Sequence, residues 1–384
     1  MPGKEVSNSS FVSADERRQA IDERRNSSAI NQAAPAPAAG AAPLTEEQLL
    51  QQEIDHFNAI QGDVLLTRNT KDLADVEAGV NGLPANIAAI RARGYVFKSY
   101  LEHKAETLTG QWHDLRPRVE ASIRTQAQQL RAQADQVQAV HNRRQRATAA
   151  MSALESQVTA AQRNLQGMYD PLNENVLQTQ KQLDDIVWTL TQAEQAAFGW
   201  LATEAPVEAV PANWQKPGDK DGVGGVLYLT DQRLVFEQKE EVATKKVLFI
   251  ATEKKKVQAL GWEVAVANIA SATGSHRGFM NKDDFLTVDC ASGAGLRTPE
   301  GATFSKADIH LMGETGDAWQ AFIGRVKNGD VAKERTVPVD EKAVASVANA
   351  PTKCGTCGAT ITQTILRGQT EISCQYCGSV IRLT

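Results

Sequence analysis

Apolar residues in the first half of the chain recur at helical spacing. The segment LTEEQLLQQEI opens with Thr45 and has Gln48 three residues later, which is the pattern of a capping box at a helix N-terminus. NGLP at 81–84 is expected to end this helix, because proline lacks the N–H group that a helix interior needs. A second helix is expected over 86–108, and Pro117 suits the first turn of a third.

A seven-residue apolar repeat dominates the segment after Pro117. It predicts a left-handed coiled coil, because apolar side chains at this spacing form one continuous seam. Arg144 interrupts the repeat and is interpreted as a register-setting polar residue or as a snorkelling side chain at an exposed end. The two rows of the repeat are Ile123, Leu130, Val137, Met151, Val158 and Leu165, and Val140, Ala147, Leu154, Ala161 and Met168.

Asp170-Pro171 is expected to end the coiled-coil helix, and a shorter heptad helix follows it. Two such helices can fold back as an antiparallel hairpin or pair between chains, and the sequence leaves both options open. The basic run RRQR at 143–146 suggests nucleic acid as a partner. However, residues 101–200 hold 10 basic and 11 acidic residues, which favours a solvated coiled-coil face. The helical region is assigned to residues 44–200.

The apolar period changes from helical to alternating after Trp200. A lead-in rich in Pro and Gly precedes GVLYLTDQRLVFEQ, which predicts two strands around Asp231-Gln232. Further strands are expected in VLFIAT, VQALGWEVAV, IASATG, FLTVDC and ADIHLMG, before a helix in GDAWQAFIGRVKNG that ends at Gly329. Residues 201–330 therefore predict an antiparallel β domain with one C-terminal helix.

This order of elements resembles a GRAM or bacterial pleckstrin-homology-like (PH-like) domain. The motif that carries the resemblance is a glycine, alternating apolar residues, then LT and RLVF, which here runs from Gly225 to Phe236. The resemblance covers about a third of the chain. It implies a β barrel or sandwich of PH type covered by its C-terminal helix, and a role in recognising lipid headgroups, membranes or peptides rather than in catalysis.

An anionic ligand would need a local basic cluster, because residues 201–330 carry 15 basic and 18 acidic residues. Two sets of lysines flank VLFIATE and are candidates for ligand binding if they converge near a barrel rim. Solvated loop charges are the simpler interpretation, and a peptide-docking role needs no basic pocket. The two sets are Lys245 with Lys246, and Lys254 with Lys255 and Lys256.

Two Cys-x2-Cys pairs lie in the last part of the sequence, Cys354 with Cys357 and Cys374 with Cys377. Each pair can point both sulfurs to one side, and two pairs supply the four corners that tetrahedral Zn²⁺ accepts. Strand-like runs in ATITQTIL, QTEIS and SVIRLT complete the pattern of a zinc ribbon over 351–384. One structural Zn²⁺ is expected, with no open coordination position for catalysis.

Composition adds few constraints. The net charge of −5 and the pI near 5.8 give no general reason to expect nucleic acid or an anionic membrane as a partner. No run of apolar residues is long enough to span a bilayer, and the start of the sequence lacks a secretory signal. Paired free thiols suit a reducing compartment, so a cytoplasmic location is expected, with peripheral membrane association as an option. Residues 1–43 are expected to be disordered, and 331–350 to be a linker.

The sequence therefore predicts a multidomain α+β protein that acts as a non-enzymatic adaptor or scaffold. No nucleophile, phosphate-loop or dinucleotide motif is found, no small-molecule substrate is evident, and Cys290 is interpreted as a core residue. The expected partners are a protein or a second copy bound through the coiled coil, and an anionic membrane surface. Two alternatives stay open: a nucleic-acid-associated factor that uses the ribbon and RRQR, and a regulatory subunit of a separate enzyme.

Overall fold

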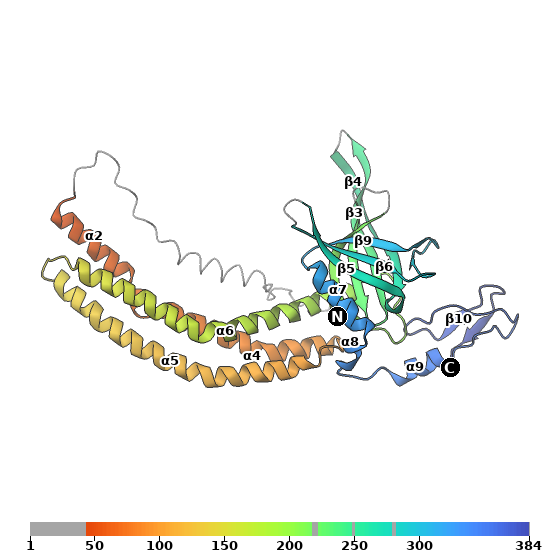
Figure 1. Cartoon of the computed structure of the whole chain (residues 1–384), viewed down its shortest axis with the longest axis horizontal. Coiled ribbons are helices and arrows are strands. Elements are labelled where there is room, and N and C mark those ends of the chain that lie inside the picture. Colours follow the sequence, from red (N-terminus) through yellow and green to blue (C-terminus); the bar gives the residue numbers. More distant parts are fainter. Residues whose placement is uncertain (1–43, 217–221, 248–249, 279–281, 384) are drawn as a thin grey trace, which may run out of the picture. The chain divides into compact units, whose positions relative to one another are not determined.

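The chain divides into two compact units (Figure 1). The computed structural model describes residues 44–216, 222–247, 250–278 and 282–383, and gives the backbone alone for 241–247 and 250–255. The tail expected to be disordered, residues 1–43, lies outside this description. One unit consists of the chain up to Ala88 and Leu101–Asp184, and the other of Ala89–Tyr100 and the chain from Asp185 onward.

Helices build the first unit. They are α2 (Glu46–Ala59), α3 (Gln61–Val64), α4 (Thr67–Ala92), α5 (Tyr100–His141) and α6 (Thr148–Glu194). The predicted capping box is confirmed, since Thr45 and Gln48 exchange hydrogen bonds at the start of α2. Gln162 of α6 donates to Asp63, and Asn69 donates to the Gln162 carbonyl and the Tyr169 hydroxyl of α6, so the α2–α4 arm lies alongside α6. The described part of this unit is an up-down-up helical bundle.

The three prolines expected to mark helix ends lie inside helices instead. Pro84 is in α4, Pro117 is in α5 and Pro171 is in α6, so these predictions were wrong. An interior proline costs a helix about 3 kcal/mol. Burial of apolar side chains on either side offsets this cost, as Leu83 and Ile87 do around Pro84.

The helix expected over 86–108 is interrupted at a glycine and not at a proline. α4 ends at Ala92, and Gly94 takes a positive φ of 86°, which a helix cannot continue. Residues 95–97 then turn inward, and Tyr95 and Phe97 are buried in the second unit. Glycine geometry, rather than proline, decides where this helix stops.

The chain reverses at Arg144, not at Pro171. Arg144 is exposed and has a φ of 56°, in the connection between the end of α5 and the start of α6. Its break in the heptad repeat therefore marks a turn at an exposed end of the helices, which agrees with the second interpretation of Arg144 and not with a register-setting core position. The apolar seam residues on both sides are buried within the unit, apart from Val140 and Met168, which are half-buried. The seam is filled by residues of the same chain.

Glu53 of α2 connects the end of α5 to the start of α6 at this reversal. Its carboxylate accepts hydrogen bonds from the His141 ring at 2.9 Å, the Ala147 N–H at 2.5 Å and the Thr148 hydroxyl at 2.8 Å. The last two donors lie at the N-terminus of α6, where a negative charge complements the helix dipole. Burial opposes ionisation of Glu53, but these hydrogen bonds outweigh it and lower the pKa of the carboxyl group.

One antiparallel sheet dominates the second unit. Its strands run in the spatial order β5-β6-β9-β1-β2-β3-β4-β7-β8, and α7 follows β9. The bounds are β1 (Pro206–Gln215), β2 (Val223–Thr230), β3 (Arg233–Val247), β4 (Ile250–Ala265), β5 (Ile269–Arg277), β6 (Asp283–Cys290), β7 (Leu296–Arg297), β8 (Thr303–Phe304), β9 (Lys306–Leu311) and α7 (Gly316–Lys327), with a 3-10 turn η1 (Val266–Asn268).

The expected strand pair around Asp231-Gln232 is confirmed as β2 and β3. The helix expected near the end of the domain is confirmed as α7, with Trp319 and Ile323 buried on its inner face. Gly225, the first residue of the PH-like motif, lies where β2 pairs closely with β3. A Cβ atom there would lie 2.0 Å from the carbonyl oxygen of Glu237, so no other residue fits without a shift of the strand.

Two strand predictions need correction. The lead-in over 201–225 contains the central strand β1, which pairs with both β2 and β9. Pro211 has no N–H group but is tolerated within β1. Its backbone polar groups face the β9 side, where pairing begins only at Ala212, so no hydrogen bond of the ladder is lost. VLFIAT is not a separate strand either. β3 ends within it at Val247 and β4 begins at Ile250, and these two residues pair.

Short elements complete the chain. The linker expected over 331–350 contains α9 (Glu341–Ala348), and α8 (Asp330–Lys333) precedes it. In the C-terminal module, defined as residues 351–383, β10 (Glu371–Ser373) pairs with β11 (Val380–Arg382). The expected strand ATITQTIL does not join them, and forms only isolated bridges at Thr360 and Leu366. No described helix is both long and apolar enough to cross a membrane.

We expect Glu53→Gln to destabilise the helical unit at pH 7, by about 1–3 kcal/mol for the lost charged hydrogen bonds. The lowered pKa means that Glu53 contributes stability above its ordinary titration range and that the contribution fades as the pH falls through the folded-state pKa. The difference between wild type and variant should therefore shrink in acid. Helical circular dichroism during thermal unfolding, at neutral and acid pH, measures it.

Glu174→Gln is the matched control, because Glu174 is an exposed carboxylate in the interior of α6, away from the helix ends of the same unit. It should leave the melting temperature unchanged at both pH values. A constant difference between Glu53→Gln and wild type from neutral to acid pH would contradict the role given to the ionised carboxylate.

Candidate metal centre

The two cysteine pairs sit on two turns of the same design. The N–H of Gly358 donates to the carbonyl of Cys354, and the N–H of Gly378 donates to that of Cys374. Both glycines have a φ of 72°, a left-handed conformation that disfavours residues with a Cβ atom. Each turn therefore presents both of its sulfurs on one side, as the sequence predicts.

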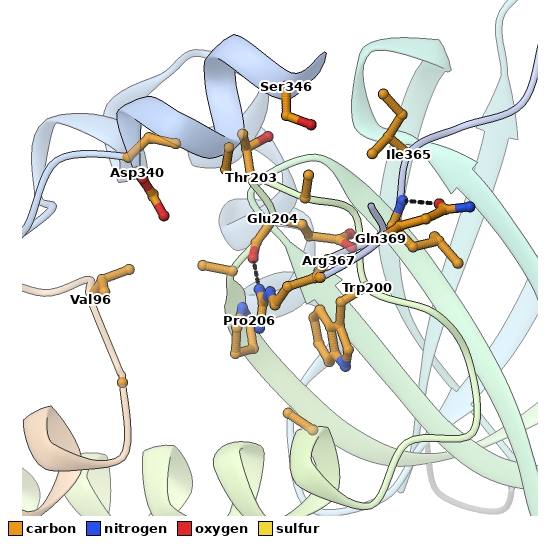
Figure 2. A pocket seen from close by; sticks show the side chains of 18 of the residues that line it. Val96, Trp200, Thr203, Glu204, Pro206, Asp340, Ser346, Ile365, Arg367 and Gln369 are labelled. Atoms are coloured by element: carbon orange, nitrogen blue, oxygen red, sulfur yellow. Dashed lines mark hydrogen bonds between the residues drawn. The ribbon is translucent and has the colours of Figure 1, made fainter. Parts of the chain in front are cut away.

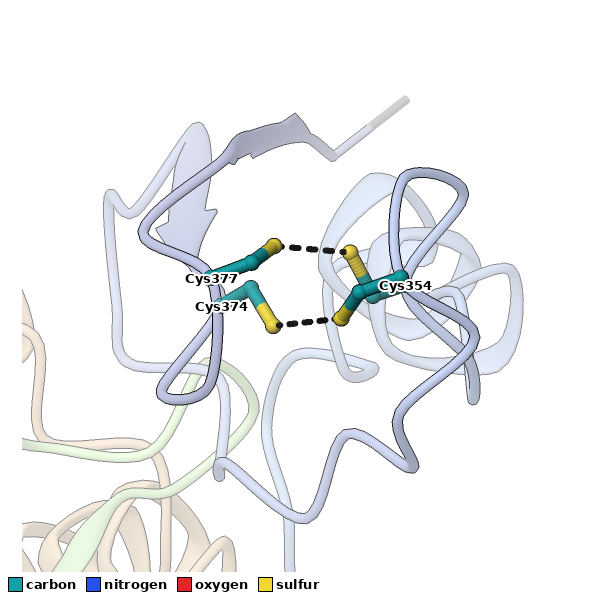
Figure 3. Close-up of side chains that lie close together, drawn as sticks. Cys354, Cys374 and Cys377 are labelled. Carbon is teal, nitrogen blue, oxygen red and sulfur yellow. Dashed lines mark hydrogen bonds between the residues drawn. The ribbon is translucent and has the colours of Figure 1, made fainter.

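The four sulfurs converge from the two turns (Figure 3). Cys354 Sγ lies 3.7 Å from Cys377 Sγ, and Cys357 Sγ lies 3.7 Å from Cys374 Sγ. A disulfide needs about 2.05 Å, so these are not disulfide pairs. Four sulfurs around one ion at about 2.3 Å would be about 3.8 Å apart in a tetrahedron. The cluster therefore fits a single metal ion, and among the described residues it is the one group of three or more metal-ligating side chains that does.

The protonation of the thiols agrees with metal binding. The Ser379 hydroxyl lies 3.1 Å from both Cys354 Sγ and Cys377 Sγ. Hydrogen bonding from Ser379 lowers the pKa of Cys354 to about 5 and also lowers the pKa of Cys377. For Cys357, the Ala359 N–H favours the thiolate, but the neighbouring sulfurs outweigh it and raise the pKa to about 12. Four thiolates can coexist here only when a cation neutralises them.

The C-terminal module has little else to hold it together. Its buried side chains in the described structure are Cys354, Cys374, Ile365 and Ile372. Two buried aliphatic residues do not provide the apolar surface that a module of this size needs to fold. A metal ion bound by the four sulfurs would supply the difference, so its role here would be structural. All four positions of a tetrahedral ion are occupied by sulfur, which leaves none for substrate or water.

The module also contacts the β domain within the same unit. The loop between the cysteine pairs carries Leu366 and Arg367 to Gly199–Glu204, here called the acceptor segment. The Ala202 N–H donates to the Ile365 carbonyl at 3.2 Å, and the Arg367 N–H donates to the Trp200 carbonyl at 2.8 Å. The Arg367 guanidinium lies 5.7 Å from the centre of the Trp200 ring and donates to the Glu204 carbonyl.

A buried ion pair shapes the acceptor segment. The Glu204 carboxylate accepts two bonds from Arg233, at 2.9 and 2.6 Å, one from the Thr230 hydroxyl and one from the Leu201 N–H. Arg233 also donates to the Gly199 carbonyl at 2.9 Å. Thr230 and Arg233 belong to the LT and RLVF parts of the PH-like motif. Here their side chains hold the loop that precedes β1.

A cavity of about 810 Å³ adjoins this contact (Figure 2). Trp200, Glu204 and Arg367 lie on one side, and Asp340 and Ser346 of the α9 region on another. A second cavity, of about 470 Å³, lies beside Leu366 and Arg233. Neither cavity could be predicted from the sequence, because the wall of each combines residues of the β domain and the C-terminal module that lie far apart along the chain.

The remaining candidates from the sequence are the five lysines and Cys290. The side chains of Lys245, Lys246, Lys254 and Lys255 lie outside the described residues, and Lys256 is exposed. Their backbones fall on β3 and β4, paired near the end of one hairpin, and do not flank a single strand as expected. Cys290, predicted to be a core residue, is half-buried at the end of β6 and lies outside the thiol cluster.

Comparisons with known proteins return solved structures alone, since no family model and no curated protein matches. The Vps36 N-terminal PH domain matches at 12% identity with a TM-score of 0.21, over 35% of this chain and 94% of that chain. The DH/PH domains of PDZ-RhoGEF, in a complex with activated RhoA, match at 11% identity and 0.22, over 76% and 96%. The DH/PH domains of p115-RhoGEF match at 12% and 0.20, over 77% and 100%. Each match contains a PH domain, but TM-scores this low do not establish a shared fold.

We expect the purified chain to carry one metal ion, visible by native mass spectrometry as one added mass that disappears on denaturation. Cys354→Ser and Cys374→Ser each remove a buried ligand and should abolish stoichiometric binding, because three thiolates leave one corner of the tetrahedron without its sulfur. Cys290→Ser is the matched control and should retain the ion. Equal metal content in all three variants would exclude the four-sulfur site.

Proposed function

We propose that this protein is a non-enzymatic adaptor that docks at an anionic membrane surface through its β domain. The observation that carries the proposal is the β3–β4 hairpin. β2 pairs with β3 only as far as Gln238, and β7 pairs with β4 only at Glu263. Beyond Gln238 and Ala259 the two strands therefore form a ribbon of their own, which rises clear of the sheet in Figure 1.

The charge of this ribbon supports the proposal. All five candidate lysines fall on it, and the residues between the two lysine sets are mainly apolar in sequence, VLFIAT. A polybasic segment gains about 1 kcal/mol for each lysine held near an anionic leaflet. Apolar residues between basic ones add burial at the headgroup boundary. The PH-like resemblance of the sequence agrees with this choice of partner, by analogy only.

For the metal site, we propose Zn²⁺. The donor set is four thiolates in a tetrahedral arrangement, and soft sulfur ligands in this geometry select zinc or iron–sulfur centres over hard cations. The spacing of the sulfurs fits a single ion rather than a cluster. Zinc would fold the C-terminal module and thereby provide a second docking surface on the adaptor.

The absence of enzymatic activity is part of the proposal. Within the described ranges, the buried charged side chains are engaged in structural pairs, such as Lys98 with Glu208 and Arg233 with Glu204. Burial alone would lower the pKa of Lys98, but the Glu208 carboxylate raises it further, so this lysine stays protonated and is a poor general base. These groups hold the fold together and are not available as general acids or bases.

Flotation with lipid vesicles tests the membrane proposal. The wild-type chain should float with vesicles that contain phosphatidylserine and not with neutral phosphatidylcholine vesicles, and salt should weaken the association. Changing Lys245, Lys246, Lys254, Lys255 and Lys256 to Glu should reduce the floated fraction at least tenfold, because attraction becomes repulsion at the ribbon.

A second five-lysine variant controls for net charge. It changes Lys282, Lys306, Lys333, Lys342 and Lys353 to Glu, all of them exposed residues of the same unit. This control should float nearly as well as wild type. Equal loss in both variants would mean that net charge alone attracts the chain, and equal flotation of the ribbon variant and wild type would remove the hairpin from the proposal. If the chain bound an acidic protein and not the vesicles, the partner of the β3–β4 ribbon would be a protein and not a membrane.

A further inference from the structure

We infer that the acceptor segment is a docking site for an extended Leu-Arg segment, and that the loop of the C-terminal module occupies it only while the four thiols hold a metal ion. The inference depends on the metal site and is independent of the membrane proposal. It assigns a function to a contact that includes neither the lysines of the β3–β4 ribbon nor the four thiols. The metal would then decide whether one edge of the β domain is covered.

The contact has the features of strand addition. Leu201 and Leu366 form an antiparallel bridge, and two backbone hydrogen bonds flank it, from Ala202 to Ile365 and from Arg367 to Trp200. Backbone bonds of this kind give affinity without demanding a sequence. The side chains supply the specificity, as the Arg367 guanidinium faces the Trp200 ring and the Glu204 carbonyl.

Gly199 has no side chain and so leaves room for a leucine on the opposite segment. A Cβ atom on Gly199 would lie 2.7 Å from the nearest Leu366 methyl carbon, so glycine leaves the space that Leu366 fills. Leu366 is still 38% exposed, and Ile365 is buried beside it. The acceptor segment thus offers a notch for an aliphatic residue, followed by an aromatic face and a carbonyl for an arginine.

The acceptor segment is rigid, whereas its occupant is not rigid by itself. Glu204, Arg233 and Thr230 fix the segment through bonds that do not involve the C-terminal module. The loop that carries Leu366 and Arg367 is tethered at Cys357 and Cys374, both of which belong to the thiol cluster. Loss of the ion therefore frees both ends of the loop while leaving the acceptor segment formed.

The contact is open to solvent, which suits reversible docking. Open clefts of about 810 and 470 Å³ border it, and Leu366 lines both. The contact consists of two backbone bonds, the Arg367 bond to the Glu204 carbonyl, one arginine–aromatic contact and one leucine contact. Such a small interface can form while the loop is tethered and would be lost by an untethered loop.

Hydrogen exchange of the full chain, followed by mass spectrometry on peptides over 200–205, tests the inference. The Ala202 N–H reports the contact directly, because its acceptor is the Ile365 carbonyl. With metal bound, Arg367→Ala should accelerate exchange in this peptide about tenfold by removing the stack and the guanidinium bond. Removing the metal from wild type with a chelator should have a similar effect, and should add little to the effect of Arg367→Ala.

Arg382→Ala is the matched control, an exposed arginine on β11 of the same module. It should keep wild-type exchange over 200–205, and peptides from β6 and β9 should not change in any sample. Equal exchange in Arg367→Ala and Arg382→Ala, or full protection after metal removal, would overturn the inference. A chain that contains no metal in native mass spectrometry would instead refute the metal site, and a chain that loads metal but does not float would refute only the membrane proposal.

Discussion

The buried ion pair between Glu204 and Arg233 is the constraint on which the second unit depends. The Glu204 side chain is fully buried and that of Arg233 nearly so, and breaking such a pair by removing one partner costs about 3–5 kcal/mol. All of the carboxylate's bonds go to the β domain itself: to Arg233, Thr230 and Leu201. The pair thereby joins the loop before β1 to the turn between β2 and β3, and gives that loop a defined shape.

This arrangement gives the LT and RLVF residues a structural role in this chain. Thr230 and Arg233 hold Glu204 and the backbone of Gly199. Asp231, between them, accepts from the Ala205 N–H and pairs with Arg335, so these residues connect the sheet to the segments before and after it. They stabilise the β domain, and the proposed recognition surfaces lie elsewhere on it.

Two of those surfaces have opposite physical characters. The β3–β4 ribbon extends beyond the sheet and carries lysines, so it suits long-range attraction to an anionic surface. The acceptor segment is a short, preformed edge that offers backbone groups and one aromatic ring, so it suits short-range pairing with an extended segment. In the proposed adaptor the two surfaces would serve two kinds of contact, and the proposed metal site would link the second one to metal binding.

The sequence by itself determined the features that depend on neighbours along the chain: the capping box at Thr45, the strand pair around Asp231-Gln232, helix α7 and the pairing of the four cysteines. Each is specified by spacing within a few residues or by the geometry of one turn. Tertiary structure decided the rest. Pro84, Pro117 and Pro171 stay within helices because burial of their neighbours outweighs a local cost, and Arg144 becomes a turn because two helices pack antiparallel. β1 and the acceptor segment could not be found in a stretch rich in proline and glycine, since their partners, β9 and the C-terminal module, lie more than ninety residues further along the chain.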